Sequence, residues 1–146
     1  MSTSITSLSR AERQAGRGLH AALWIAQILL ALLFGTAGIL KSTTPLPVLA
    51  QKLAWTASVP GPLVRFIGVA ELAGVLGLLL PALTRVRPAL TPLAAAGLLT
   101  VMILAIAFHV SRGEAGLIGM PVVLGALAAF VAWGRYRGAP IPARSR

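Results

Sequence analysis

Glu71 is the residue of this sequence whose chemistry fits least with its surroundings. It lies in the apolar segment GVAELAGVLG, roughly 12 Å along a helix when the helix is counted from Leu63. A carboxylate in such a segment must be protonated or paired with a cation, because apolar groups do not solvate a charge. Glu71 is therefore the first candidate for an acid, a base or a polar contact to a ligand.

Four basic or titratable residues are candidate partners of Glu71. Lys41 ends the first apolar stretch and His109 ends the third, so either side chain is a candidate acid/base or a polar contact to a ligand. Arg65 comes less than two helical turns before Glu71, and Arg112 follows the third stretch; we place both in the candidate ligand-binding set. Lys and Arg at helix ends can also extend to the membrane surface without such a role.

Three uncharged polar side chains inside the apolar stretches complete the candidate ligand-binding set. Depth counted along the helices places them near or somewhat beyond the layer of Glu71. They are Gln27, Thr36 and Thr100. Two structural alternatives stay open. Gln27 can form a hydrogen bond between helices, and Glu71 can join Lys41 or His109 in a buried polar contact that fixes how the helices align.

We expect no metal centre and no covalent cofactor. The chain has no cysteine, which excludes disulfides, thiolate metal sites and thiol redox chemistry within it. One Glu and one His do not complete a ligand shell, and the sequence contains neither HExxH nor a paired Glu-x-x-His motif.

The elements that must position these residues are membrane-spanning helices. Of the 146 residues, 57% are hydrophobic and 11% are charged, which is too apolar for a soluble domain of this size. The apolar residues form continuous, non-alternating runs, which favours helices over barrel strands. The sequence predicts an all-α, integral membrane, antiparallel four-helix bundle with spans at about 19–40, 63–83, 88–110 and 117–133.

The connection between the first two spans carries its own structure. Prolines open it, helix-forming residues fill 48–57, and Pro60-Gly61-Pro62 breaks it. This pattern predicts a short interfacial helix or a re-entrant loop that covers one end of the bundle. A linker without a ligand role is the alternative.

The basic residues predict the orientation. Four of them fall on one side of the predicted spans, and nine fall on the other: Arg10, Arg13, Arg17, Arg85, Arg87, Arg135, Arg137, Arg144 and Arg146. The positive-inside rule then places both termini in the cytoplasm, and we expect a multi-pass protein of a bacterial-type inner membrane. The net charge of +10 therefore reflects mainly topology and contact with anionic lipids, and not nucleic-acid binding. The predicted organisation is a polar, basic cytoplasmic tail at 1–18, a four-span domain at 19–137 and an irregular cytoplasmic tail at 138–146.

Several segments together resemble the DoxX-like family of small four-span membrane proteins. They are FGTAGILK (34–41), RFIGVAELAGVLGLLLP (65–81), PLAAAGLLTVMILAIAFHVSRGE (92–114) and WGR (133–135). Lys41, Glu71 and His109 match the polar pattern of the family. The resemblance implies a link to membrane redox complexes, because the namesake is the small membrane subunit of a thiosulfate:quinone oxidoreductase. Other relatives are linked to the assembly of membrane proteins.

We therefore expect a protein that binds a lipophilic small molecule, quinone-like or isoprenoid-like, at a polar site centred on Glu71. In a redox system, a partner protein would supply the electron carrier. One alternative is a cofactor-independent membrane enzyme (an isomerase, cyclase or hydrolase) with Glu71 as acid or base. Another is an assembly or chaperone-like factor that binds the spans of a partner membrane protein or of a second copy. The lipid bilayer is the surrounding partner in every case.

Overall fold

The computed structural model describes residues 2–144, and this part of the chain is helical without any strand. The long helices are α1 (Ser2–Thr43), α3 (Gly61–Thr84), α4 (Leu90–Ser111) and α5 (Gly119–Trp133). The short ones are α2 (Leu46–Lys52), the 3-10 helices η1 (Ala54–Ser58) and η2 (Ala115–Leu117), and the π-helical turn η3 (Gly134–Gly138). The predicted all-α fold is confirmed, and α2 with η1 forms the expected short helical segment between the first two spans.

Four helices are long and apolar enough to cross a membrane. The helices α3, α4 and α5 begin and end within two residues of the segments 63–83, 88–110 and 117–133. The helix α1 differs, because it starts at Ser2 and so includes nearly all of the segment 1–18 that the sequence suggests as a tail. Strong helix formers in RAERQA, joined to a span that supplies the helical nucleus, account for this extension.

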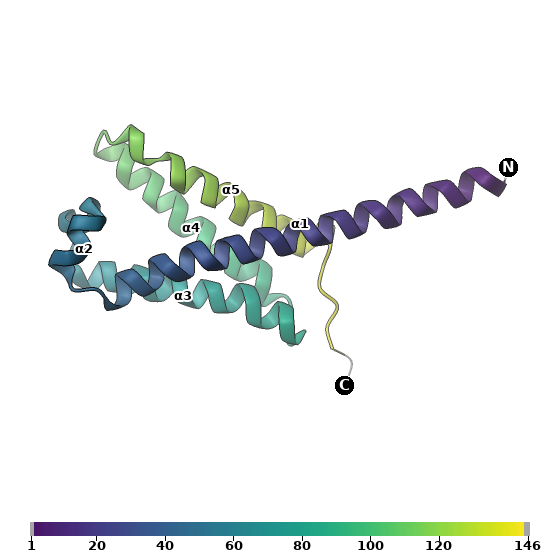
Figure 1. Ribbon diagram of the computed structural model, residues 1–146, viewed down its shortest axis with the longest axis horizontal. Coiled ribbons are helices and arrows are strands. Elements are labelled where there is room, and N and C mark those ends of the chain that lie inside the picture. Colours follow the sequence, from purple (N-terminus) through teal and green to yellow (C-terminus); the bar gives the residue numbers. More distant parts are fainter. Residues whose placement is uncertain (1, 145–146) are drawn as a thin grey trace.

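Neighbouring helices pack in the order α1, α3, α4 and α5, and α5 returns to contact α1. Figure 1 shows two antiparallel pairs, α1 with α3 and α4 with α5, which diverge toward the end where α2 lies. We call this the α2 end; the opposite end, with the α3–α4 connection and η3, is the termini end. The apolar core lies between the helices and includes Leu23, Leu30, Phe34, Leu78, Leu98, Ala128 and Val131.

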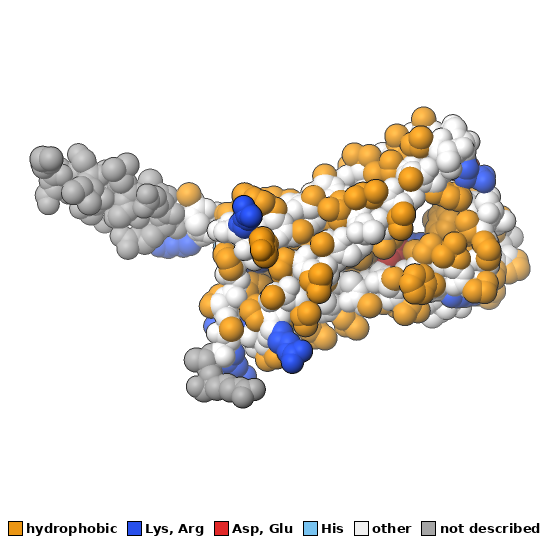
Figure 2. Space-filling model, turned by 180° about the vertical axis from the view of Figure 1, so that it is seen from behind, with side chains coloured by type: hydrophobic (Ala, Val, Ile, Leu, Met, Phe, Trp, Pro, Cys, Tyr) orange, Lys and Arg blue, Asp and Glu red, His pale blue; other side chains and the backbone are white. Residues whose placement is uncertain are grey.

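Large apolar side chains also cover the outside of the bundle (Figure 2). More than half of the residue surface is exposed at positions on all four long helices, such as Ile25, Leu32, Phe66, Leu76, Leu93, Ile103, Met120 and Val123. So apolar a surface would be unfavourable in contact with water, and the helices therefore require a lipid bilayer around them. The chain is a multi-pass membrane protein.

Glycines set the close approach of α1 and α3. A Cβ added to Gly68 would lie 2.8 Å from the Cβ of Lys41 and 3.0 Å from the carbonyl oxygen of Gly38. A Cβ added to Gly38 would lie 2.9 Å from the carbonyl oxygen of Gly68. Backbone atoms cannot move aside as a flexible side chain can, so only glycine permits this separation of the two helices.

This close contact makes a direct prediction for Gly68→Ala. The extra methyl group overpacks the α1–α3 interface and should lower the free energy of unfolding by about 1–3 kcal/mol. The matched control is Gly97→Ala on α4, where an added Cβ meets nothing within 4 Å and the better helix propensity of alanine should be neutral or stabilising. Thermal unfolding in detergent, followed by circular dichroism, measures both variants. Equal melting temperatures for the two variants would contradict the proposed packing role.

Candidate functional site

Lys41 and Glu71 form a buried ion pair between α1 and α3. The Nζ atom of Lys41 donates to Oε1 of Glu71 at 2.6 Å and to Oε2 at 2.7 Å. Only 7% of Lys41 and 1% of Glu71 is exposed. Side chains on a helix tilt toward its N-terminus, so on two antiparallel helices they tilt toward each other. Lys41 therefore reaches back into the bundle while Glu71 reaches toward the α2 end.

The glycines described above lie on the face that carries this pair. Gly38 precedes Lys41 by three residues, and Gly68 precedes Glu71 by three residues, so each glycine shares a helix face with one charged residue. The close approach of the backbones at the glycines brings the two side chains within hydrogen-bonding distance. The same approach excludes water from the contact.

Arg65 supports Lys41 from the α2 end and does not contact Glu71. Its Nη1 donates to the carbonyl oxygen of Lys41 at 2.5 Å, and its Nη2 donates to that of Thr44 at 2.6 Å. The carbonyl of Lys41 lies in the last turn of α1 and that of Thr44 directly follows the helix, where no further turn of helix provides donors. The guanidinium therefore caps α1 and holds the end of the helix that carries Lys41.

Aromatic side chains connect the ion pair to α4. The Nζ atom of Lys41 lies 6.0 Å from the centroid of the Trp55 ring, which η1 contributes. Trp55 packs edge to face on Phe108 of α4, with ring centroids 6.2 Å apart. Because α2 and η1 contribute Trp55, this segment bridges the two diverging helix pairs at the α2 end. Figure 2 shows that the surface is hollowed toward this end, with acidic and basic side chains visible in the hollow.

His109 and Arg112 pair with Glu114 and not with Glu71. His109 Nδ1 lies 2.7 Å from Oε2 of Glu114, and Arg112 Nε donates to Oε1 at 2.8 Å. The hydrogen bond with His109, followed by the one with Arg112, holds the pKa of Glu114 below its usual value. Sequence reasoning assigned no role to Glu114, although Gly113 with its positive φ of 70° is the kind of residue that turns a chain back on a helix end.

The three uncharged polar candidates do not join this cluster. The hydroxyls of Thr36 and Thr100 donate to carbonyl oxygens one turn earlier in their own helices, and both residues are exposed on the outer surface. Gln27 is buried, donates from Nε2 to the carbonyl oxygen of Leu78 at 2.9 Å and accepts a hydrogen bond from Arg135. Gln27 therefore belongs to the termini end and makes the interhelical contact that the sequence left as an alternative.

The ion pair retains unused hydrogen-bonding capacity. An ammonium group has three N–H donors, and Glu71 accepts two of those of Lys41. The carboxylate oxygens each keep a second lone pair. The pair can thus offer one donor and one acceptor to the polar group of a small molecule without breaking its own contact. The residues that the structure describes contain no group of three or more His, Asp or Glu side chains that could hold a metal ion.

Comparison with known proteins identifies one family. The model of the DoxX-like family matches residues 25–131, a range that includes Lys41, Glu71 and His109. The comparisons with curated proteins and with solved structures find no match.

The geometry of the ion pair predicts strong coupling between Lys41 and Glu71. Either Lys41→Met or Glu71→Leu leaves one buried charge unpaired, which should cost about 3–5 kcal/mol of unfolding free energy. The double variant removes both charges and should recover most of that loss. Unfolding in mixed micelles measures the four proteins, and Lys52→Met tests an exposed lysine as the control. Additive losses in the double variant would contradict the pairing.

Proposed function

The chain belongs to the DoxX-like family, and on that premise we propose that it binds a lipophilic small molecule with a polar head, quinone-like or isoprenoid-like, at the Lys41–Glu71 pair. The observation that carries the proposal is the burial of both charges within membrane-spanning helices. Ionisable groups are expensive inside a bilayer, and a buried ion pair contributes little net stability compared with apolar residues of the same size. A role in ligand binding would explain why two charges are buried here despite the cost in free energy.

The hydrogen-bonding capacity of the pair suits a carbonyl or hydroxyl head group. The third N–H of Lys41 would donate to a ligand carbonyl, and a Glu71 oxygen would accept from a ligand hydroxyl. The ring of Trp55 lies beside Lys41 and packs on Phe108, and would provide a surface on which a flat head group can stack. The hollow at the α2 end would admit the head group, and the tail would remain among the lipids (Figure 2).

In a redox system, this chain would hold the lipophile and position its head group. The chain contains no cysteine, so its own thiols do not carry electrons. A partner membrane or redox protein would supply the electron carrier.

A binding experiment tests the role of the pair. A short-chain ubiquinone analogue is titrated into detergent-purified protein, and quenching of tryptophan fluorescence reports binding. Lys41→Met/Glu71→Leu, which should fold because no charge is left unpaired, is expected to bind at least about tenfold more weakly, since it lacks the charge-assisted hydrogen bonds. Arg137→Gln is the control and should bind like the wild type, because Arg137 is exposed in η3 at the opposite end of the bundle.

The affinity of the double variant decides the proposal. If this variant is folded and binds the analogue as tightly as the wild type does, the pair is a structural contact and the proposal fails. Mass spectrometry of the purified wild type, expected to detect a co-purified quinone or isoprenoid, gives a second and independent test.

We further propose that the termini end faces the cytoplasm, in a bacterial-type inner membrane. The support is the excess of basic residues there, which include Arg85, Arg87, Arg135 and Arg137. The absence of native cysteine allows single-cysteine labelling with a membrane-impermeant maleimide. Ser58→Cys in η1 should react in intact spheroplasts, and Val86→Cys in the α3–α4 connection should react only after permeabilisation. The reverse pattern would overturn the orientation.

A further inference from the structure

Arg135 is a second buried cation, at the opposite end of the bundle from Lys41. It lies in η3 and is only 3% exposed. Its Nε donates to Oε1 of Gln27 at 2.6 Å, and its Nη1 lies 3.1 Å from Nδ1 of His20 and 3.3 Å from the carbonyl oxygen of Ala139. All three partners are formally neutral groups. The Nη2 atom is buried and has no hydrogen-bond partner.

The surroundings of Arg135 have more donors than acceptors. His20 faces Nη1 of Arg135 through Nδ1 and the indole N–H of Trp24 through Nε2. A neutral imidazole accepts through one ring nitrogen only, so His20 cannot satisfy both donors. Together with the two N–H groups of the unpartnered Nη2, this leaves more donors than acceptors around the guanidinium. Such a surplus of donors around a cation is the arrangement that binds an anion.

No side chain in the described part of the chain neutralises this charge. The acidic residues whose side chains the structure describes are Glu71 and Glu114, and both lie toward the α2 end. Glu12 precedes His20 by eight residues on α1 and is therefore about 12 Å farther out along the helix. A buried charge without a counter-ion is strongly unfavourable. Among the described side chains Arg135 thus has no counter-ion, which favours an anion supplied by another molecule.

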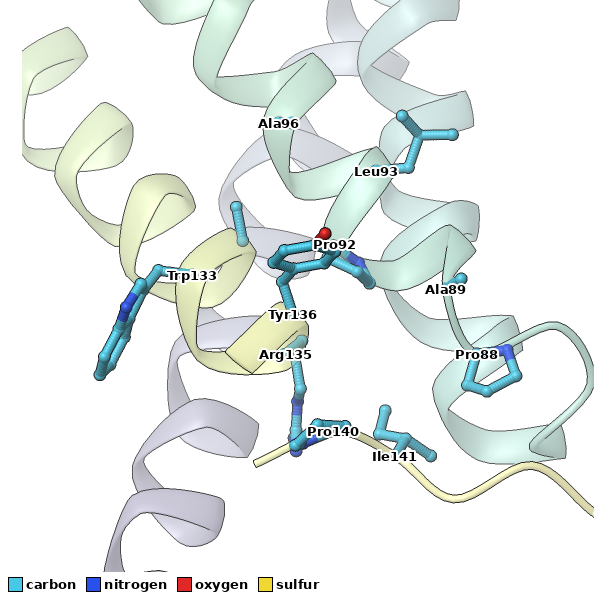
Figure 3. A pocket seen from close by; sticks show the side chains of 11 residues that line it. Pro88, Ala89, Pro92, Leu93, Ala96, Trp133, Arg135, Tyr136, Pro140 and Ile141 are labelled. Atoms are coloured by element: carbon cyan, nitrogen blue, oxygen red, sulfur yellow. The ribbon is translucent and has the colours of Figure 1, made fainter. Parts of the chain in front are cut away.

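A cavity of about 740 Å³ adjoins Arg135 and has an apolar lining. Its walls come from the start of α4, from the end of α5 with η3, and from the irregular segment 139–144. Figure 3 shows Arg135 extending toward Pro140, and the Tyr136 ring beside Pro92. The size is that of a cavity for a small organic ligand. The lining indicates that the ligand has a large apolar part besides its negative charge.

We propose that this cavity binds an anionic phospholipid, with the lipid phosphate at the guanidinium of Arg135. The glycerol and the first carbons of the acyl chains would occupy the apolar cavity, and the chains would continue along exposed Leu93 and Trp133. Exposed Trp133 and Tyr136 fit the level of the membrane interface, where phosphate groups lie. Further positive charge at this end attracts acidic lipids from the same leaflet.

The segment 139–144 lies beside the guanidinium of Arg135, and we place the entry of the phosphate on this side. Nη2 is buried and Arg135 extends toward Pro140 (Figure 3), so on this proposal the phosphate reaches the guanidinium when the segment moves aside. The far end of the segment is held by a hydrogen bond from the backbone N–H of Arg144 to the carbonyl oxygen of Arg85 at 3.0 Å. Displacing this segment breaks no helix or strand, because residues 139–144 form no regular secondary structure.

Lipid-dependent thermal stability tests this site separately from the Lys41–Glu71 pair. Purified protein is melted in detergent alone and with phosphatidylglycerol, phosphatidylcholine or inorganic phosphate. Phosphatidylglycerol should raise the melting temperature of the wild type most, because it alone combines a net negative charge with acyl chains. The effect should be lost, with at least about a tenfold weaker apparent affinity, in Arg135→Gln. Arg137→Gln, which removes the same charge from an exposed neighbour, should keep it.

A second variant keeps the test decisive if Arg135→Gln does not fold. Ala96→Phe fills the apolar cavity from the exposed side of α4, leaves Arg135 in place and should also lose the response to phosphatidylglycerol. Equal stabilisation by inorganic phosphate would overturn the lipid assignment in favour of a free-phosphate site. An unchanged response to phosphatidylglycerol in Arg135→Gln, or in Ala96→Phe when Arg135→Gln does not fold, would overturn the site altogether.

Discussion

The close contact between α1 and α3 at Gly38 and Gly68 is the constraint on which the α2 end of the bundle depends. The two backbones touch there, and this places Lys41 and Glu71 within hydrogen-bonding distance of each other. Larger residues at the glycines would separate the helices and admit lipid between two charges. The ion pair between Lys41 and Glu71 therefore depends on the close packing at Gly38 and Gly68.

The two helix pairs stay connected at the end where they diverge, through the segment formed by α2 and η1. The pairs α1 with α3 and α4 with α5 converge at the termini end around the apolar core and diverge at the α2 end (Figure 1). The segment formed by α2 and η1 spans the opening and contacts both sides through Trp55. Aromatic contacts of Trp55, with Lys41 on one side and Phe108 on the other, therefore link the two helix pairs where they separate. The α2 end therefore offers a lipophile more space than the closely packed apolar core does.

Each end of the bundle contains one buried cation, and the two cations differ in their partners. At the α2 end, Lys41 has a carboxylate from the same chain. At the termini end, Arg135 has only neutral partners and an unpartnered nitrogen beside an apolar cavity. The first arrangement is complete within the protein, whereas the second calls for an anion from the surrounding membrane. Lys41 is therefore neutralised by Glu71 within the bundle, whereas Arg135 is the proposed binding site for a lipid phosphate.

The sequence by itself determined the fold class, the four spans and the unusual position of Glu71, because continuous apolar runs and a lone carboxylate are properties of local composition. It offered Lys41 and His109 equally as partners of Glu71, since residue counting gives depth along a helix but not direction around it. Only the tertiary structure shows that Glu71 pairs with Lys41, that His109 contacts Glu114 and that Gln27 accepts a hydrogen bond from Arg135. Those choices depend on how the helices rotate about their axes, and packing between helices sets that rotation.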